Sequence, residues 1–537
     1  MSHSHRPLPL ALATALLLGS AVVHAELTSD ADGNTRIGTG VFDVLTAGTV
    51  NNSGFGFNAL KSVTSGGGNS AFGAAALQLL TTGTQNNAFG RGALTTVLVG
   101  QRNNAFGFDA LAANTADDNT AFGDSALKGN SIGTRNSAFG ANALVGNVGD
   151  SNDNSAFGYI ALQGINTGSG NTALGSRALS GNTTGASNVA VGFKAMQNNT
   201  TGASNVAAGV EALSSNTTGI NNSAFGHQAL MSNVAANENA AFGNFALLGN
   251  VSGLNNVAMG VSVLRSNVSG SNNTGIGHLA LRNSTGSSNT ALGKSALTAN
   301  TRGTRNVAVG VSALAANTTG TDNTALGNAA GSAITTGINN VLIANTGSAR
   351  DTRTIRIGKP GTQTRAFIAG IRGVTVTRGA AVMVNSAGQL GVQTSSKRFK
   401  TDIAPMADTS SPLMALEPVT FRYKEADENG EHPLQFGLIA EDVAKVMPEL
   451  VVYDEQGKPE TVAYHELASL LLNELKKEHA ARMDDRAVLA REVAELRADA
   501  ASREASLAAL TRAMAELREV TDRLTAGNAG KASVATR

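Results

Sequence analysis

The sequence predicts a mainly β protein whose larger part is a parallel β-solenoid. First, nearly the same phrase recurs seventeen times between Asn52 and Gly331: Asn, any residue, a small residue, an apolar residue, Gly, two variable residues, Ala and Leu. Second, the copies keep a period of about 17 residues, which is typical of coils that bury their apolar side chains against neighbouring coils. Third, with 62 Gly, 4 Tyr and no Trp in 537 residues, the chain lacks the large side chains that fill a globular core of this size.

A glycine anchors each copy, and the spacing between these glycines never departs from the period by more than one residue. They are Gly56, Gly73, Gly90, Gly107, Gly123, Gly140, Gly158, Gly175, Gly192, Gly209, Gly226, Gly243, Gly260, Gly277, Gly293, Gly310 and Gly327. Stacked at the usual strand spacing of about 4.8 Å, sixteen steps make a rod of roughly 75–80 Å. Degenerate units at 34–38 and 340–344 are expected to cap the array, so we assign residues 26–345 to the solenoid.

Each repeat is expected to contain one short strand, because residue types alternate with a period of two ahead of the glycine. Asn always stands four residues before the glycine, Ala or Gly two before it, and Phe directly before it in nine copies. We expect the bulky residue to point inward with the later Ala and Leu, while the small residues let another backbone approach. The Asn column forms either a buried ladder of side-chain amides or a series of turn caps, and the sequence leaves both open.

The first 25 residues resemble a secretory signal peptide. A basic start at 1–6 precedes a largely apolar run at 7–23, and Val23-His24-Ala25 has the small-residue pattern of a cleavage site. We therefore expect export with cleavage after Ala25 and a secreted or cell-surface location. No later stretch offers the roughly 20 apolar residues that span a bilayer, so no transmembrane segment is expected after signal removal. The chain has no cysteine, so disulfides do not stabilise it.

A change of composition follows the solenoid. Residues 346–394 are expected to form a β-rich neck, with alternating strand patterns at 352–358 and 366–373 around a Lys-Pro-Gly turn. From Ser395 the sequence becomes charged, with mixed α and β patterns, and we assign residues 395–480 to a small α/β module.

The C-terminal segment 481–525 carries a seam of residues at alternating steps of four and three. The seam comprises Leu489, Val493, Leu496, Ala500, Arg503, Leu507, Leu510, Met514, Leu517, Thr521 and Leu524. Over about five heptads this pattern predicts a coiled-coil helix, the alternative being one amphipathic helix docked on a globule. Residues 526–537 are expected to be a disordered tail.

Charge and motifs exclude several functions. The 40 basic and 39 acidic residues give a net charge of +1, so nothing favours binding to nucleic acid or to an anionic membrane. The repeats contain no phosphate-binding glycine loop, zinc-protease helix or calcium-binding nonapeptide. Asp117, Asp118, Asp150 and Asp153 fall in loops of variable length rather than in the fixed geometry of a catalytic pair, and His227 stands alone. We predict no cofactor and no metal site.

Residues 395–477 resemble a known family. The blocks that carry the resemblance, with Asp402 and Tyr464 between them, are Ser395–Lys400, Leu416–Tyr423, Phe436–Val443, Pro448–Val451 and Leu470–Leu475. In this order they are similar to the C-terminal intramolecular chaperone of phage tail spikes and endosialidases, family 74 of the serine peptidases. The family often has Asp after the opening serine, where this chain has Ser396.

The resemblance implies a module that trimerises, assists folding of the fibrous part ahead of it, and then cuts itself off at the serine. By position, Ser395 would be the nucleophile and Lys400 the base, with cleavage between Thr394 and Ser395. A serine hydroxyl needs a base to take its proton, and a lysine serves only when neutral, which burial in the assembled module favours. An uncleaved module that only trimerises is the alternative.

The repeats resemble the heads of trimeric autotransporter adhesins in architecture, although the period here is longer. We therefore expect a secreted or surface homotrimeric fibre, adhesin-like, with a self-cleaving chaperone module and an unknown host-surface or glycan ligand. The alternative is a tail-spike-like protein that binds or degrades polysaccharide and carries the same module. Few aromatic residues (4%) and no acidic clusters argue against this alternative.

Overall fold

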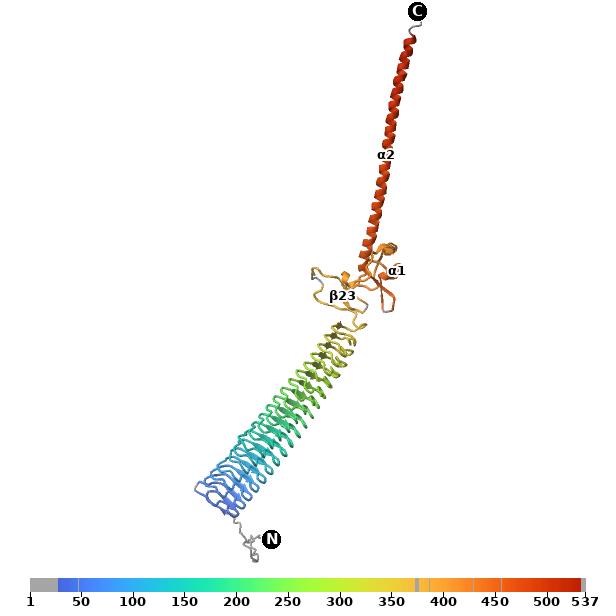
Figure 1. Cartoon of the computed structure of the whole chain (residues 1–537). Helices are drawn as coiled ribbons and strands as arrows, with labels where there is room; N and C mark the ends of the chain where they lie inside the picture. Colours follow the sequence, from blue (N-terminus) through green and yellow to red (C-terminus); the bar gives the residue numbers. More distant parts are fainter. Residues whose placement is uncertain are drawn as a thin grey trace, which may run out of the picture. The chain divides into compact units, whose positions relative to one another are not determined.

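The structure is a computed structural model of the whole chain (Figure 1). It describes residues 28–46, 48–371, 376–385, 387–427, 429–454 and 456–532. The expected signal peptide, 1–25, lies outside these residues. The chain divides into two units, Met1–Phe367 and Ile368–Arg537, and each is described by itself. Over the described ranges, no helix is both long enough and apolar enough to cross a membrane.

The first unit is the predicted parallel β-solenoid. β1 (Thr28–Ser29) pairs antiparallel with β2 (Thr35–Ile37), and from β2 onward each strand pairs in parallel with the next. The series ends at β21 (Ile355–Ile357), which pairs with β20. The sequence pattern assigns β21 to the neck, so the solenoid sheet continues beyond the expected boundary at residue 345.

The strands between these ends are three residues long and stack in register, one per coil. They are Ser53–Phe55 (β3), Ser70–Phe72 (β4), Asn87–Phe89 (β5), Asn104–Phe106 (β6), Thr120–Phe122 (β7), Ser137–Phe139 (β8), Ser155–Phe157 (β9), Thr172–Leu174 (β10), Val189–Val191 (β11), Val206–Ala208 (β12), Ser223–Phe225 (β13), Ala240–Phe242 (β14), Val257–Met259 (β15), Thr274–Ile276 (β16), Thr290–Leu292 (β17), Val307–Val309 (β18), Thr324–Leu326 (β19) and Val341–Ile343 (β20).

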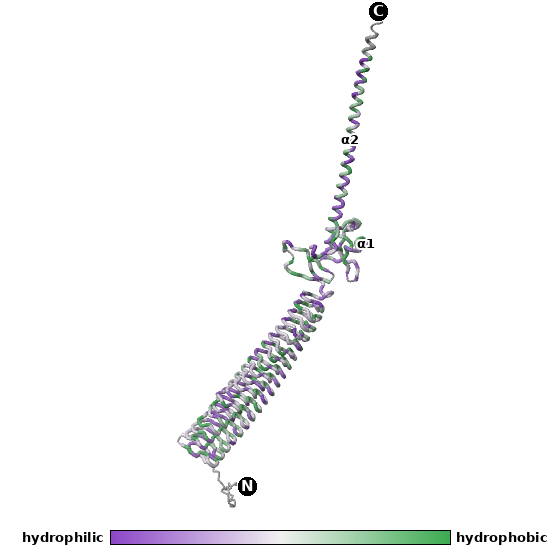
Figure 2. Tube along the Cα trace, in the orientation of Figure 1, coloured by the Kyte–Doolittle hydropathy of each residue, from purple (hydrophilic) through white to green (hydrophobic). Residues whose placement is uncertain are grey.

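The interior of most coils holds small side chains and one leucine, which is replaced by Met196 in one coil. In the coil around Gly209, Ala207, Ala212 and Leu213 are completely buried, and the equivalent residues recur in the other coils. Figure 2 shows apolar residues returning coil after coil along the solenoid. The leucine has a positive φ, 51° at Leu213, a left-handed conformation that costs about 1–2 kcal/mol. Its full burial, worth about 1.5–3 kcal/mol, offsets that cost.

The expectation that Phe points inward is wrong. Phe122 is 54% exposed and Phe139 is 37% exposed, whereas the Ala in the middle of each strand is buried. The reason is the strand period of two: Asn and Ala, four and two residues before the glycine, share the inner face, so the bulky residue between Ala and Gly must point outward. The interior is filled by Ala, Leu and Asn.

The predicted Asn column is a buried ladder, and it also fixes the turns. Asn69 donates its backbone N–H and its side-chain Nδ2 to Asn52 Oδ1 at 2.9 Å each. The same Nδ2 donates to Gly83 O at 3.0 Å. Both alternatives left open by the sequence therefore hold, because one amide links consecutive coils and satisfies a turn carbonyl in the dry interior.

From Asn114 onward, a second buried ladder stands seven residues after the glycines, where the first three coils have Val63, Leu80 and Val97. Asn199 Nδ2 donates to Asn182 Oδ1 at 2.7 Å and to Gly202 O at 2.9 Å, and the pattern repeats in later coils. The sequence pattern suggests only turns at these residues. Their recurrence at the repeat period, ahead of Thr-Thr-Gly, is the signal that could have revealed the ladder.

The glycine after each strand is required by close backbone packing. Gly73 has a φ of 137°, and a Cβ there would lie 2.6 Å from the carbonyl carbon of Gly90 in the next coil. Such close approaches leave no space for any side chain, which explains why this position tolerates only glycine through the array.

The second ladder is interrupted where its column changes residue type. Ser284 takes the place of Asn in a coil of sixteen residues, and the Oδ1 atom of Asn267 below it has no hydrogen-bond partner. Ile334 ends the column, and Asn317 Oδ1 is likewise unpaired. Ile165 also replaces an Asn of this column, but there the Ser151 hydroxyl donates a hydrogen bond to Asn147 Oδ1.

The second unit begins within the expected neck, at Ile368, and the second strand expected in the neck is missing from the described residues. Ala366–Ile371, the described part of the second expected strand, is not a strand. Instead β22 (Val382–Val384) and β23 (Leu390–Val392) form an antiparallel hairpin. Its turn is held by Asn385 Oδ1, which accepts from the N–H groups of Ala387 and Gln389. The neck therefore makes its β-structure about fifteen residues later than expected, where an Asx turn supplies the closing bonds.

The remainder of this unit mixes short elements with one long helix. They are η1 (Lys397–Phe399), η2 (Ala407–Ala415), β24 (Val419–Phe421), β25 (Gln435–Gly437), α1 (Ala440–Val446), η3 (Pro448–Leu450), β26 (Val451–Tyr453), β27 (Pro459–Val462) and α2 (Tyr464–Ala532). β24 pairs with β25 and β26 with β27, both antiparallel. A small core gathers between η2, α1, β26, β27 and the first turns of α2.

Helix α2 is continuous, so two expected boundaries do not appear in it. It starts inside the expected module and runs through 481–525, and residues 526–532 are helical where a disordered tail was expected. The described apolar residues of the seam, such as Leu507 and Leu510, are exposed in the single chain. A coiled coil therefore stays a prediction.

We predict that Ser284→Asn stabilises the solenoid. Asn114 already occupies the equivalent position of another sixteen-residue coil, where it accepts from Asn130 Nδ2, so the shorter turn admits the amide. The introduced amide would donate to Asn267 Oδ1 and remove a buried unpaired acceptor, a gain of about 1 kcal/mol in the free energy of unfolding. Chemical denaturation of the full-length protein measures it.

Ser269→Asn is the matched control, because Ser269 lies exposed in the neighbouring turn. Equal changes in the free energy of unfolding for Ser284→Asn and Ser269→Asn would contradict a stabilising role of the second Asn ladder.

Candidate active site

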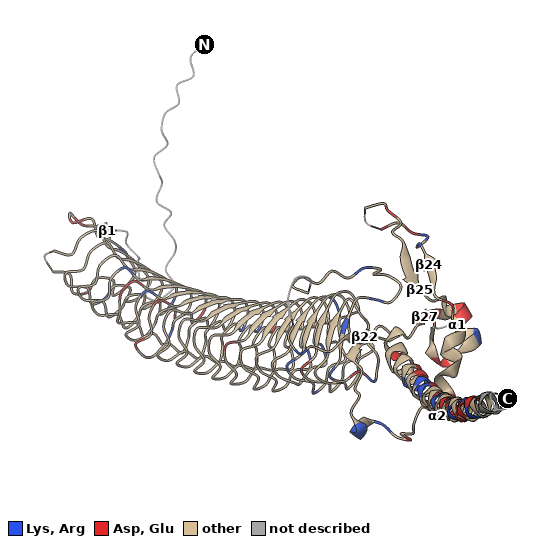
Figure 3. Ribbon diagram, turned by 90° about the horizontal axis from the view of Figure 1, so that it is seen from above, with Lys and Arg blue, Asp and Glu red and all other residues tan. Residues whose placement is uncertain are grey.

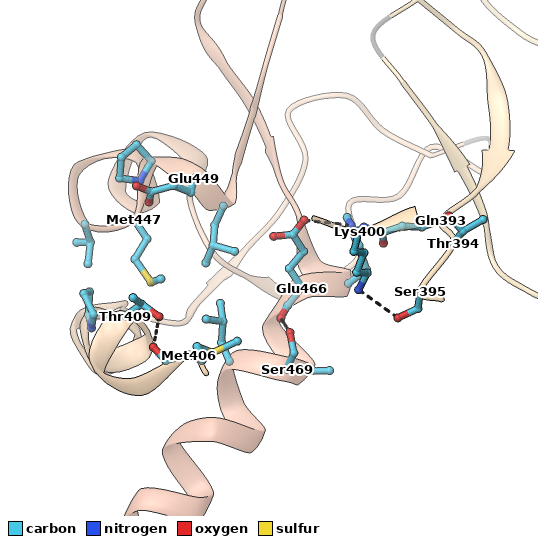
Figure 4. A pocket seen from close by; sticks show the side chains of 17 residues that line it. Gln393, Thr394, Ser395, Lys400, Met406, Thr409, Met447, Glu449, Glu466 and Ser469 are labelled. Carbon is cyan, nitrogen blue, oxygen red and sulfur yellow. Dashed lines mark hydrogen bonds and ion pairs between the residues drawn. The ribbon is translucent and has the colours of Figure 1, made fainter. Parts of the chain in front are cut away.

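One turn of 3-10 helix brings the two predicted site residues together. Ser396 precedes η1 and Lys400 follows it, both with extended backbone, and the Phe399 and Lys400 N–H groups close the turn onto the Ser396 and Lys397 carbonyls. The chain thereby folds back, and Lys400 Nζ donates a hydrogen bond to Ser395 Oγ at 3.3 Å. Figure 4 shows the two side chains facing one another. A spacing of five fits this geometry, since a 3-10 turn takes three residues.

The pair stands at the edge of an open hollow of about 980 Å³. Its walls come from the end of the neck (Gln393, Thr394), from η2, from the segment around η3, and from the first turns of α2. Ser395 and Lys400 are both exposed in the single chain. Their burial, expected from the need for a neutral lysine, is therefore not achieved by one chain alone.

Three ionisable residues of the hollow were not predicted. Glu449, His465 and Glu466 line it together with the Ser-Lys pair, and His465 Nε2 lies 3.7 Å from Glu466 Oε1. They follow Lys400 by about fifty residues or more, so no local spacing links them to it. The available signal was that Glu449 lies inside the Pro448–Val451 block and that His465 and Glu466 directly follow Tyr464.

Tyr464 fixes the start of α2 over the strand that precedes α1. Its hydroxyl accepts from the Leu438 N–H at 2.9 Å and lies 3.4 Å from the Leu438 carbonyl. This bond orients the helix that carries His465 and Glu466. It gives a structural reason for a tyrosine at position 464, between two of the sequence blocks of the family resemblance.

A polar cluster joins η2 to α2 below the hollow. The buried Ser410 hydroxyl donates to Glu474, and Asn473 Nδ2 donates to Ser410 Oγ at 2.6 Å and to Ala407 O at 2.8 Å. Lys477 Nζ donates to Glu474 Oε1 at 2.9 Å. The hydrogen bond from Ser410, reinforced by Lys477, holds the pKa of Glu474 below its ordinary value.

The acidic residues considered in the repeats are structural. Asp118 and Asp153 accept bidentate hydrogen bonds from Arg102 and Arg135 of the preceding coil. These bonds lower the pKa of both carboxyl groups. Across the part of the chain that the structure describes, no group of three or more His, Cys, Asp or Glu could hold a metal ion.

Comparison with known proteins places a domain on this site. Residues 395–452 match the family model of the chaperone of endosialidase, so the match begins at Ser395 itself and includes Lys400. No curated protein and no solved structure matches the chain. The chain thus carries a chaperone-of-endosialidase domain after a β-solenoid, an arrangement consistent with a tail-spike-like or fibre-like protein.

We predict that Glu474→Gln destabilises this unit at neutral pH. The native carboxyl has a lowered pKa, so its ionised form stabilises the fold above the ordinary carboxyl pKa of 4.5. As pH falls through the lower native pKa, that contribution is lost. The thermal midpoint, followed by helical circular dichroism, should be lower for the variant at pH 7 and should converge with that of the unsubstituted protein in acid.

Glu478→Gln is the control, since Glu478 pairs only with Arg482 on the exposed side of the helix. A variant difference that persists unchanged in acid would contradict the role of the Glu474 charge.

Proposed function

We propose that the protein is a secreted or cell-surface homotrimeric fibre whose C-terminal module assists its folding and then releases itself. The observation that carries the proposal is the hydrogen bond from Lys400 to Ser395 at the first residue of the chaperone-of-endosialidase match. The solenoid that precedes this module would be the folding client.

The proposed cleavage is intramolecular and happens once per chain. Neutral Lys400 takes the proton of Ser395 Oγ, and the oxygen attacks the carbonyl carbon of Thr394. The peptide C–N bond then breaks, with a proton passing to the Ser395 nitrogen, and leaves an ester between Thr394 and Ser395 Oγ. Water hydrolyses this ester to the Thr394 carboxylate and the free hydroxyl. Because nucleophile and scissile bond belong to adjacent residues, proximity supplies much of the acceleration.

Exposed apolar side chains in the second unit support a homotrimer. Phe399, Met414 and Phe436 are exposed beside the small core of the module, and β22 and β23 bury almost none of their side chains. Isolated large apolar side chains are common on surfaces, but a dense set of them marks an association surface. The exposed heptad seam of α2 would be covered in the same assembly.

The solenoid favours a structural role over a polysaccharide-degrading one. Asp118 and Asp153 are each paired with an arginine. Neither carboxylate is therefore free to act as the acid or the nucleophile of a glycosidase pair. A carbohydrate-binding role for the fibre is compatible with these pairings and would be an adhesin-like function.

We predict that the secreted protein yields a C-terminal fragment starting at Ser395, and that Ser395→Ala abolishes it. Lys400→Met should slow its formation by about 10²–10⁴-fold, the usual contribution of a general base. Denaturing gels and the N-terminal sequence of the fragment measure both effects.

Lys397→Met is the matched control, because Lys397 is exposed three residues away and the hydrogen bond to Ser395 comes from Lys400 instead. If the unsubstituted protein stays full length but trimeric by light scattering, self-cleavage is wrong and an uncleaved trimerisation module is the better description. Turnover of a glycan by the N-terminal part would overturn the structural role.

A further inference from the structure

The outer face of the solenoid sheet is free of charge. We define the strand face as the first and third residues of each strand from β3 to β20, which point away from the interior. None of these residues is Asp, Glu, Lys or Arg. The chain as a whole has 79 such residues among 537, so a charge-free run over all these strands is a selective feature of the face.

The third residues of the strands form an apolar column on the strand face, beside first residues that are mostly Ser, Thr and Asn. In the first seven of these strands it is Phe, and the rings stack between consecutive coils, with centroids 4.5 Å apart for Phe55 and Phe72. From β10 onward the column continues as Leu, Val, Met and Ile, with Ala208 in β12 and Phe again in β13 and β14, and Leu326 is 49% exposed. Apolar side chains in an unbroken column at the strand spacing form one contiguous patch.

Charged residues lie at other positions of the coil. The arginine–aspartate pairs Arg102–Asp118, Arg135–Asp153 and Arg305–Asp322 stand five residues before the glycines, outside the strands. Charges are sparse over the stacked coils and dense along α2 (Figure 3). Charged side chains of the coils therefore lie outside the strand face.

The strand face has the size of a stable protein interface. Eighteen strands at about 4.8 Å spacing extend for about 80 Å, and three residues of strand are about 10 Å wide. The face thus covers roughly 800 Å², close to the area that each partner contributes to a standard interface. The first-residue column is mostly Ser, Thr and Asn, so about half of this area, roughly 400 Å², is apolar, which is the size of the largest apolar patch on a typical monomer.

We propose that the strand faces of three copies of this chain pack against one another around a common axis, so that the Phe column becomes part of an interchain core. The proposal rests on the homotrimer of the proposed function and names its surface in the solenoid. A second copy fits better than a small ligand, because ligand sites are concave pockets with a few specifically placed polar groups, whereas the strand face repeats the same kinds of side chain over eighteen coils. Only a partner with the same coil spacing can match an apolar column along its whole length.

Cysteine cross-linking tests this packing, because the chain has no cysteine of its own. Val191→Cys and Val189→Cys place thiols on the strand face, at residues 36% and 37% exposed. Around a threefold axis, equivalent residues of one coil approach each other. Mild oxidation with copper phenanthroline should therefore link two of the three chains, giving a dimer band on a denaturing gel that disappears with reductant.

Thr201→Cys is the control, since Thr201 is equally accessible but lies in the turn of the coil. All variants carry Ser395→Ala so that the full chain is retained, and light scattering gives their mass. A mass of one chain would overturn the trimer and with it this packing. A mass of three chains, with no more dimer from Val191→Cys and Val189→Cys than from Thr201→Cys, would overturn the strand-face packing and leave the proposed trimer intact.

Discussion

The side-chain amide of the Asn column is the interaction on which the solenoid depends. A coil with so narrow a section encloses backbone groups that water cannot reach, and each of them needs a partner. Asn69 meets this need with one side chain, because its amide bonds to the neighbouring Asn and to the Gly83 carbonyl. An aliphatic side chain in its place would leave a buried carbonyl and a buried N–H without partners.

The same constraint decides which residues are outside. The amides and the alanines occupy the inner side of each strand. The side chain between the Ala and the Gly, which is often Phe, therefore has no interior position. Phe, Leu and Val in the third strand position are left on the surface, where only stacking along the column shields them. In a solenoid built in this way, neighbouring coils satisfy one another's backbone groups along the axis, but the apolar side chains on its lateral surface remain exposed. This exposed apolar surface is a direct consequence of the narrow interior.

The sequence allowed the repeat and its strand to be predicted because these depend on a local period, and it gave the buried Asn ladder as one of two alternatives. It failed for Phe because hydrophobic character was used to choose the inner face, whereas the Asn at the other end of the strand already determined it. The pairing of Ser395 with Lys400 was predicted from the family resemblance, and the two side chains are in contact because one 3-10 turn separates them. Glu449, His465 and Glu466 were not, because tertiary folding alone brings them to the hollow.

In the single chain, both units leave residues exposed that an assembly of several chains could bury. In the solenoid an apolar column is left uncovered, and in the module Ser395 and Lys400 are both exposed to solvent. A Ser-Lys pair becomes reactive in a drier environment, since desolvation disfavours the ammonium. If the neighbours that cover the exposed apolar residues of the module also close the hollow, assembly itself would activate the pair, and no separate signal would be needed to time the cut. Cleavage would then follow trimerisation by the same burial of apolar surface that stabilises it.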